Sequence, residues 1–236
     1  MKKSILLTLV FILVVSLCTL ANAYSTNNYS FDVPSTWSSA GQAGVYKNSE
    51  GNGVNVQITK FAGDAGNPYT EENLKVLVNT VENDLDTYRD ELAASLKQTY
   101  GLRVTDAQIK QYVSSFRCKS VDLSEITTCS KNNYKCFHIV ANYELKDYSY
   151  YCNQYSIVSG NEIYTLTLSA EDKDDFDTEE MKSVVDSFTI KNYQEPKGGS
   201  SILMWTLIGA GIGAVVGVIV YFLNKNKNKS DNGLNG

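Results

Sequence analysis

The 236-residue chain has a single histidine, and it has no C-x-x-C pair that would mark a zinc or redox site. His138 lies in an alternating strand pattern beside Phe137 and Ile139. As a general base it would need a nucleophile or an acid partner, and the sequence shows neither. We therefore expect a structural histidine, no catalytic residue, and no resident metal or cofactor.

The sequence also lacks a phosphate-binding loop and the familiar pattern of a calcium-binding loop. Gly51 and Gly53 lie between two predicted strands and no helix follows them, which excludes a phosphate-binding loop. The densest acidic cluster consists of aspartates within residues 172–177, but Phe176 occupies a ligand position and no glycine makes the sharp turn. We interpret it as a solvated lead-in to the next helix, with a calcium site as the alternative.

Positive charge is scarce between the two apolar ends of the chain. Residues 24–200 hold 16 Lys plus Arg against 25 Asp plus Glu, and the whole chain has a formal net charge of −5. An acidic domain repels nucleic acid and anionic lipid headgroups, because both are negatively charged and bind basic surfaces. Nucleic acid is therefore excluded as a partner, and the identity of any other ligand stays open.

The first 23 residues have the form of a secretory signal peptide. A basic Lys2-Lys3 head precedes an apolar run over residues 5–20, and Ala21-Asn22-Ala23 supplies the small residues that a signal peptidase reads. Cleavage there gives a mature chain that begins at Tyr24. The alternative is an uncleaved anchor helix, for which the apolar run is short.

The other end of the chain is typical of a membrane anchor. Residues 202–223 contain no charged residue, and a helix of this length spans about 33 Å, which matches a bilayer core of about 30 Å. Three lysines follow at once, so residues 224–236 are predicted to lie in the cytoplasm. Residues 192–201 are polar and form a short stalk. The sequence predicts a single-pass protein of the cell membrane, with domain 24–191 outside.

One face of the predicted anchor consists of small residues. Gly209, Gly213 and Gly217 recur every fourth position. Small residues allow two helix backbones to approach closely, which stabilises association in lipid, although glycine is also common in membrane helices generally. We expect lateral association, either as a homodimer or with another membrane protein.

Four cysteines lie in the outer domain: Cys118, Cys129, Cys136 and Cys152. An even number in an exported domain indicates two disulfides with three possible connectivities, and a metal site is the alternative. A two-residue turn at Asn132-Asn133 would place Cys129 directly opposite Cys136. Cys118 and Cys152 would then form the second bridge.

The hydrophobic period changes twice along the outer domain. Alternation predicts strands at residues 29–33 and 54–58, and apolar residues spaced three or four apart then predict one helix from Glu71 to Gly101. Thr70 is expected to cap this helix, and Thr105 with Gln108 predicts a capping box that opens a shorter one. Alternation then returns in an antiparallel meander over residues 116–123, 134–145, 148–158 and 163–168.

The last part of the domain returns to a helical pattern. Asp177 with Glu180 predicts another capping box, before a helix that contains Met181 and Val184. Residues 188–190 are expected to form a final short strand.

Tyrosine is abundant, with 16 in the chain. Six of them lie in the meander: Tyr143, Tyr148, Tyr150, Tyr151, Tyr155 and Tyr164. A face of tyrosines can bind glycans or proteins, because each ring combines a large contact area with a polar tip. The same residues also suit an ordinary half-buried sheet, so both interpretations stay open.

The order of these segments resembles PsbP-like domains. Residues 29–37 read YSFDVPSTW, which is similar to the opening Y-x-F-x-x-P-x-x-W of that family. Residues 70–74, TEENL, are similar to the start of its first long helix. Residues 164–170, YTLTLSA, and 181–188, MKSVVDSF, are similar to its closing strand and helix. The resemblance covers residues 28–60 and 134–190, whereas the stretch 88–130 departs from it.

The resemblance implies an α+β fold in which helices pack on both faces of an antiparallel sheet. Members of the family are mostly non-catalytic binding or accessory subunits, and no functional residue of the family can be matched here. We therefore expect a binding or accessory domain that associates with another protein or with itself. The alternatives are an exported hydrolase whose carboxylates are brought together by the fold, and a cell-surface structural protein.

Overall fold

The computed structural model describes residues 22–40, 43–61, 66–83, 85–100, 105–145 and 148–196. The predicted anchor with Gly209, Gly213 and Gly217 lies outside these ranges, as does most of the predicted signal peptide. Within the ranges, no helix is both long and apolar enough to cross a membrane. The predicted signal peptide and anchor therefore remain predictions.

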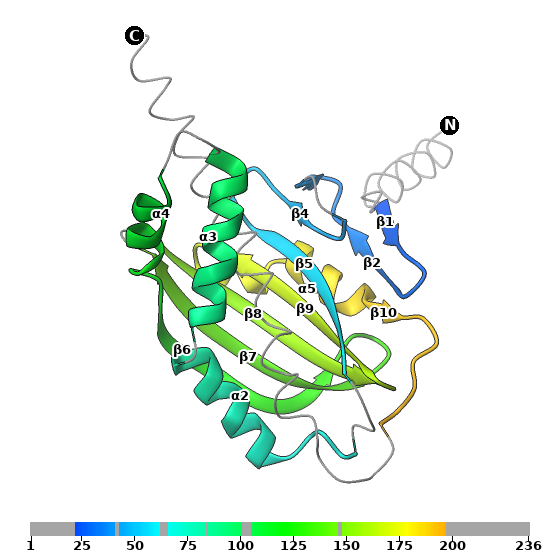
Figure 1. Cartoon of the computed structure of the whole chain (residues 1–236). Coiled ribbons are helices and arrows are strands. Elements are labelled where there is room, and N and C mark those ends of the chain that lie inside the picture. Colours follow the sequence, from blue (N-terminus) through cyan, green and yellow to red (C-terminus); the bar gives the residue numbers. More distant parts are fainter. Residues whose placement is uncertain are drawn as a thin grey trace, which may run out of the picture.

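A seven-stranded antiparallel sheet forms the centre of the domain, in the order β3-β4-β5-β9-β8-β7-β6 (Figure 1). Its strands are β3 (Ser38–Ser39), β4 (Tyr46–Lys47), β5 (Gly53–Lys60), β6 (Arg117–Cys129), β7 (Tyr134–Leu145), β8 (Tyr148–Ser159) and β9 (Glu162–Ala170). The last four follow one another in the chain and form the predicted meander. β5 pairs with β9 along its whole length, which joins the two ends of the domain.

A second sheet of three short strands lies beside the first. Its strands are β1 (Asn22–Ser25), β2 (Tyr29–Val33) and β10 (Thr189–Ile190), with β2 in the middle. β1 includes the end of the predicted signal peptide. Cleavage after Ala23 would leave Tyr24 and Ser25 in place, where they pair with Phe31 and Ser30.

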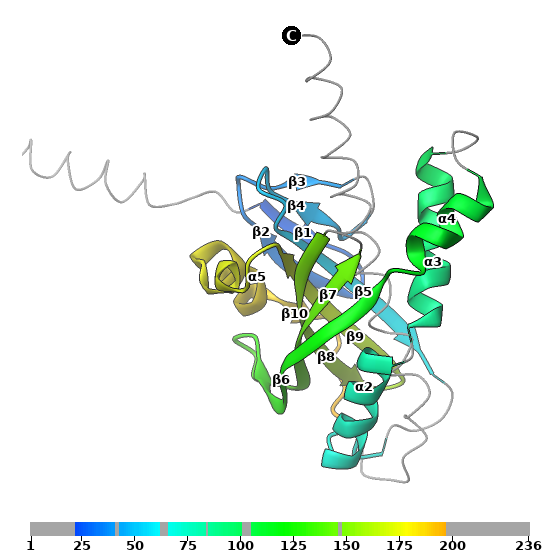
Figure 2. The same ribbon diagram turned by 90° about the vertical axis from the view of Figure 1, so that its left-hand side faces the viewer.

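Helices cover both faces of the large sheet, as expected for an α+β domain. The helical segments are α2 (Glu71–Asn83), α3 (Asp86–Tyr100), α4 (Asp106–Val113), the 3-10 turn η2 (Lys173–Asp177) and α5 (Glu179–Ser187). Figure 2 shows α2, α3 and α4 on one side of the sheet, with α5 on the other. Two hydrophobic clusters fill the layers, one beneath α2–α4 and one between the sheet, α5 and β2.

Four of the six meander tyrosines belong to these two layers. Tyr143 and Tyr150 are buried in the cluster beneath α2–α4, whereas Tyr155 and Tyr164 belong to the cluster on the α5 side. Tyr148 and Tyr151, the other two, are half-buried. None of the six is exposed, and four of them supply the two cores of a covered sheet.

The prediction of one continuous helix up to Gly101 is wrong, because the helix is broken between Asn83 and Asp86. Asn and Asp side chains compete with the backbone for hydrogen bonds and disfavour a helix interior. Leu85 is buried at the break, and its carbonyl accepts a hydrogen bond from the amide of Arg89 (2.9 Å). The break lets α2 pack on β6 while α3 packs on α4.

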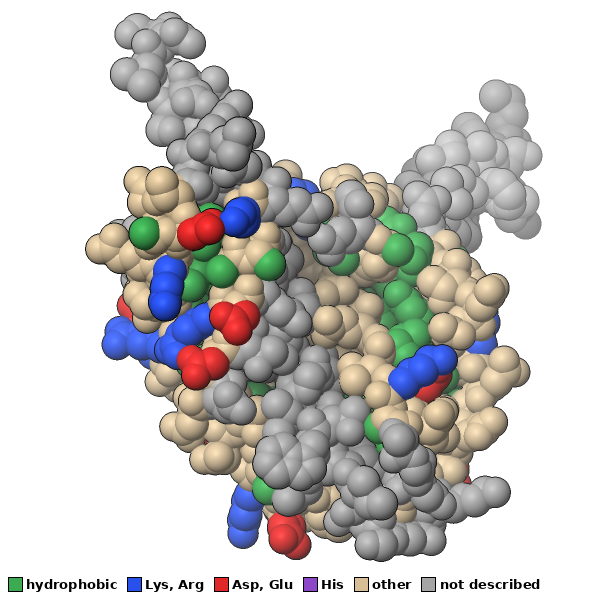
Figure 3. Space-filling view, in the orientation of Figure 1, with side chains coloured by type: hydrophobic (Ala, Val, Ile, Leu, Met, Phe, Trp, Pro, Cys, Tyr) green, Lys and Arg blue, Asp and Glu red, His purple; other side chains and the backbone are tan. Residues whose placement is uncertain are grey.

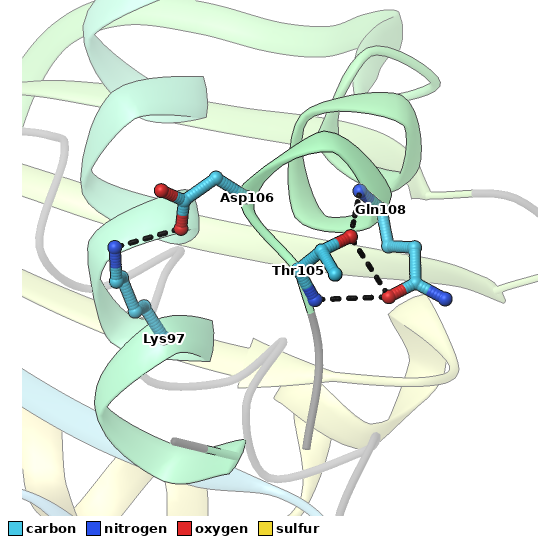
Figure 4. Close-up of polar contacts among 4 residues, drawn as sticks. All are labelled: Lys97, Thr105, Asp106 and Gln108. Carbon is cyan, nitrogen blue, oxygen red and sulfur yellow. Dashed lines mark hydrogen bonds and ion pairs between the residues drawn. The ribbon is translucent and has the colours of Figure 1, made fainter. Parts of the chain in front are cut away.

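Two of the three predicted helix starts are confirmed. The amide of Asn73 donates to Thr70 Oγ1 (3.2 Å) at the start of α2. At the start of α4 the amide of Thr105 donates to Gln108 Oε1 (2.9 Å), and the amide of Gln108 donates to Thr105 Oγ1 (3.3 Å) (Figure 4). This reciprocal pair satisfies amides that have no partner inside the helix.

The capping box predicted from Asp177 and Glu180 is wrong. Thr178 caps α5, and its Oγ1 accepts from the amide of Met181 (3.4 Å). Glu180 is used elsewhere, because its carboxylate accepts from Trp37 Nε1 and from Thr36 Oγ1, both at 2.8 Å. A partner distant in sequence thus takes the side chain that the local pattern assigned to the cap.

Charges of both signs are mixed on the helical face of the domain. In Figure 3, Lys and Arg side chains alternate with Asp and Glu over α3 and α4, while hydrophobic side chains gather over β2 and its neighbours. Lys97 of α3 pairs with Asp106 of α4 (2.7 Å), and Arg89 pairs with Asp86 (2.9 Å). Among the described side chains of this face, positive and negative charges are thus interspersed.

Candidate functional site

A cavity of about 400 Å³ lies between the large sheet and the segment that contains η2 and α5. β7, β8 and β9 supply its floor, which consists of His138, Val140, Asn153, Tyr155 and Leu168. η2 and α5 supply its wall, which consists of Lys173, Asp174, Phe176, Asp177, Lys182, Val185 and Asp186. An apolar base with a few convergent polar groups is the usual composition of a binding site.

His138 lies at the centre of a polar network on this floor. Its Nε2 is 2.8 Å from Asn153 Oδ1, and its Nδ1 is 3.3 Å from Glu125 Oε1. Strand register brings the three together, because His138 of β7 pairs with Glu125 of β6 and lies next to β8. The histidine is thus held in place by neighbours on two adjacent strands.

Tyr155 supports the histidine from below. Their rings stack with centroids 4.3 Å apart and planes 9° from parallel. Burial raises the pKa of Tyr155 to about 12, while a hydrogen bond from Asn153 acts in the opposite direction. Asn153 therefore bridges the imidazole and the phenol, and its place in an ordinary alternating strand offered no sign of this role.

The two lysines of the wall are already engaged by carboxylates. Lys182 Nζ is 3.2 Å from Asp177 Oδ1, and Lys173 Nζ is 3.1 Å from Asp122 Oδ2. A hydrogen bond from Ser120, and a smaller effect of one from Lys173, lower the pKa of Asp122, so this carboxylate stays ionised. Neither lysine is left as an isolated positive charge.

Asp174 and Asp186 differ from the other charged residues of the wall. Both are exposed, and among the described ranges no lysine or arginine forms an ion pair with either carboxylate. The wall of the cavity therefore carries an excess of negative charge. Sequence reasoning noted the aspartates around residue 174 as a helix lead-in and did not connect them with Asp186 or His138.

No metal centre is assembled in the part of the chain that the structure describes. Within it, no three His, Cys, Asp or Glu side chains come together in a way that could hold a metal ion. The four cysteines and the aspartates of η2 are among these residues, so neither the alternative metal site nor the alternative calcium loop is seen there.

The hairpin that carries two of the cysteines differs from the prediction. Residues 130–133 form the turn, so Cys129 pairs with Tyr134 and Cys136 pairs with Thr127. Ser130 and Asn133 both adopt positive φ, at 66° and 54°, which accommodates the longer turn. The two cysteines are diagonal neighbours on one face rather than directly opposite. All four cysteines are present as thiols, with no disulfide between them.

Comparison with known protein families identifies the family to which this domain belongs. The family model described as PsbP matches residues 20–190, a range that runs from before β1 to the end of β10. The chain belongs to the PsbP family. The PsbP match is continuous, so it also includes α3, α4 and β6, where the sequence had suggested a departure. The cavity at His138 lies wholly within the PsbP domain.

Two solved structures that are similar to this PsbP domain come from bacteria. Cyanobacterial PsbP (CyanoP) from Synechocystis sp. PCC 6803 shares 16% identity at a TM-score of 0.40, covering 73% of this chain and 94% of that one. A protein from Bacteroides thetaiotaomicron VPI-5482 shares 12% identity at a TM-score of 0.35, covering 69% of this chain and 45% of that one. No curated protein matches the chain.

Proposed function

We propose that this PsbP-family chain is a membrane-anchored, extracytoplasmic binding domain that acts as an accessory to a partner protein. The cavity at His138 is the observation that carries the proposal, because it combines an apolar floor, a fixed polar network and an excess of carboxylates. In this proposal a lysine or arginine side chain of the partner enters the cavity.

Charge supports a basic side chain as the occupant. Asp174 and Asp186 are carboxylates without an ion-pair partner among the described residues, whereas Lys173 and Lys182 are engaged. The outer domain is acidic as a whole, which attracts a basic partner before contact. An acidic ligand would meet repulsion at the same wall.

The apolar residues of the cavity suit the rest of such a side chain. Val140 and Leu168 line the floor, and Phe176 lies in the wall above them. Lysine and arginine bury a long aliphatic stem on such surfaces while the charged head stays near carboxylates or aromatic rings. One long basic side chain therefore matches both the floor and the wall.

The proposed location of the domain, outside the cell and at the membrane, follows from the two ends of the chain. A signal peptide over residues 1–23 exports it, the helix over 202–223 anchors it, and the stalk over 192–201 keeps the domain near the membrane surface. Gly213 lies at the centre of the small-residue face, which would bring the anchor against another membrane helix. Both contacts would then hold the same partner.

The first test is crosslinking of the intact chain in its own membrane. We expect one captured partner that is lost or reduced at least about tenfold by Asp174→Lys combined with Asp186→Lys. Glu72→Lys combined with Glu82→Lys is the matched control, since it makes the same charge change at two exposed positions of α2, on the opposite side of the sheet. Equal capture by all variants would refute the cavity as the contact site.

The anchor contact is tested in the same experiment with Gly213→Ile. A branched side chain at this position prevents close helix approach, so crosslinks within the membrane should disappear. If neither a partner nor a self-dimer is captured from any variant, the accessory role fails. Hydrolytic activity of the chain on small esters and peptides would then become the leading alternative.

A direct probe distinguishes a basic side chain from other ligands. The purified full chain is titrated with a short Gly-Ser peptide that contains one arginine, and binding is followed by saturation-transfer NMR. The control peptide contains citrulline, which keeps the shape and loses the charge. We expect a signal for arginine alone that Asp186→Lys abolishes and Glu82→Lys preserves.

A further inference from the structure

The turn between β6 and β7 brings two thiols into contact. Cys129 is the last residue of β6 and Cys136 is the third residue of β7, and their register makes them diagonal neighbours on one face. Cys136 is fully buried and Cys129 is 6% exposed, both in the cluster that packs against α5. The register therefore places the two side chains next to one another on the same buried face of the hairpin.

The two side chains interact directly. Two effects raise the pKa of Cys136 well above its usual range: the hydrogen bond between the thiols, which is the larger, and burial. Hydrogen bonding requires the two sulfur atoms to face one another, which is also the arrangement from which an S–S bond forms. Burial and the raised pKa keep the Cys136 thiol protonated in the folded chain, so the bridge needs an oxidant that reaches the thiols during folding.

We propose that Cys129 and Cys136 form the one disulfide of this domain, and that Cys118 and Cys152 stay thiols. Formation proceeds by exchange with a disulfide oxidant, such as an exported thiol oxidase or oxidised glutathione. The S–S bond of the oxidant breaks as that of the protein forms, and the two thiol protons end on the reduced oxidant. In the cell this rests on the proposed export of the domain, because the cytoplasm keeps thiols reduced.

The second bridge expected from the sequence is excluded by strand order. Cys118 of β6 pairs with Tyr143 of β7, and Cys152 of β8 pairs with Ala141 of the same β7. β7 therefore lies between the two cysteines, and strands two places apart are separated by about 10 Å. A disulfide requires Cα atoms within about 7 Å, so this pair cannot close without displacing β7.

The Cys129–Cys136 bridge would reinforce the wall of the cavity. The turn it closes is attached to the end of α5, since the amide of Lys131 donates to the carbonyl of Asp186 (3.1 Å) and Ser130 Oγ donates to that of Phe188. Asp186 is also a wall residue of the cavity. Oxidation would therefore hold the turn that fixes α5 against the sheet.

Peptide mapping of the full chain tests the pairing. The chain is purified from its membrane without reductant, alkylated under denaturing conditions and digested with trypsin. Cleavage after Lys131 and Lys135 separates the two cysteines, so a bridge appears as peptide 120–131 linked to peptide 136–146. A chymotryptic digest yields peptide 117–123, in which we expect Cys118 to be alkylated, and Cys152 is expected to be alkylated as well.

A second arm separates the pairing from the proposed export. The reduced chain is unfolded, refolded in the presence of oxidised glutathione and mapped in the same way. Failure to link Cys129 with Cys136 here, or a link between Cys118 and Cys152, overturns the pairing. A bridge that forms here but is missing in chain taken from cells leaves the pairing intact and refutes the export.

Thermal unfolding gives an independent measurement. Reduction should lower the unfolding temperature of the wild-type chain by about 5 °C, because the bridge restricts the unfolded chain. Cys129→Ala with Cys136→Ala should remove this response to reductant, whereas Cys118→Ala with Cys152→Ala should keep it. If the first double variant does not fold, the peptide map of the wild-type chain still decides the pairing.

Discussion

His138 stacks on Tyr155 in the floor of the cavity, with ring centroids 4.3 Å apart, because the two residues are directly paired between β7 and β8. The stack and the surrounding hydrogen bonds hold the His138 ring in one orientation at the floor of the cavity. Asn153 completes this network by contacting both rings, and this residue allows a sharp test of whether the network is structural, functional or both.

Asn153→Ala should lower the free energy of unfolding by about 2 kcal/mol, because the substitution leaves the buried side of His138 without its partner. It should also weaken partner capture, since His138 would no longer be held in one orientation. Urea unfolding and the crosslinking assay measure the two effects. Asn28→Ala, at an exposed asparagine remote from the cavity, is the control, and a similar loss there would show that the network is unimportant.

Glu180→Ala should destabilise the domain by about 2 kcal/mol, because it removes the acceptor of Trp37 Nε1 and Thr36 Oγ1. Trp37 is 7% exposed, so its N–H would have little access to water as a substitute. Urea unfolding followed by tryptophan fluorescence measures the change. Glu179→Ala, at the exposed neighbouring position, should have a much smaller effect, and equal losses would contradict the assigned role of Glu180.

Thr105→Ala should cost about 1 kcal/mol, because the capping box at the start of α4 loses its hydroxyl acceptor. α4 packs through Ile109 and Val113, so loss of the cap loosens a packed helix and not a free one. Amide hydrogen exchange in α4 together with urea unfolding reports the loss. Gln111→Ala on the exposed side of the same helix should leave both measurements nearly unchanged.

Gly44→Ala should destabilise the domain more than Gly160→Ala does. Both glycines adopt positive φ, at 77° and 59°, so the backbone strain of an alanine is similar. A Cβ at Gly44 would lie 2.5 Å from the hydroxyl of buried Tyr29, whereas one at Gly160 would meet the flexible side chain of Gln194 at 3.1 Å. The difference in urea midpoint isolates the clash with Tyr29, and identical midpoints would show that Tyr29 can move away.

Local sequence patterns predicted most of the elements because their causes are local. Alternation along β2, β5 and the meander reports which side chains face the core, and a sheet imposes that period wherever one face is covered. Thr70 and Thr105 predicted helix starts because a cap uses an amide only three residues away. The two failures have different causes: at Asn83 polar side chains compete locally with the helix backbone, whereas Glu180 is taken by the distant partner Trp37.

The site was much less predictable than the fold. His138 was noticed as the single histidine, but its partners Glu125 and Asn153 come from two neighbouring strands. Asp186 enters the cavity only because α5 packs across the sheet at that point. Nothing in the residues that flank these positions distinguishes them from ordinary strand and helix surface.

The sequence by itself determined the acidic character of the domain, the alternation of its strands and the apolar ends of the chain, because these depend on composition and on periods of a few residues. The two covered faces of its sheet were implied by the resemblance to PsbP-like domains. Tertiary structure alone decided that Cys129 faces Cys136 diagonally, that β7 separates Cys118 from Cys152, and that a cavity opens beside His138. Strand register and helix docking set these relationships, and both are fixed by contacts between residues far apart in the chain.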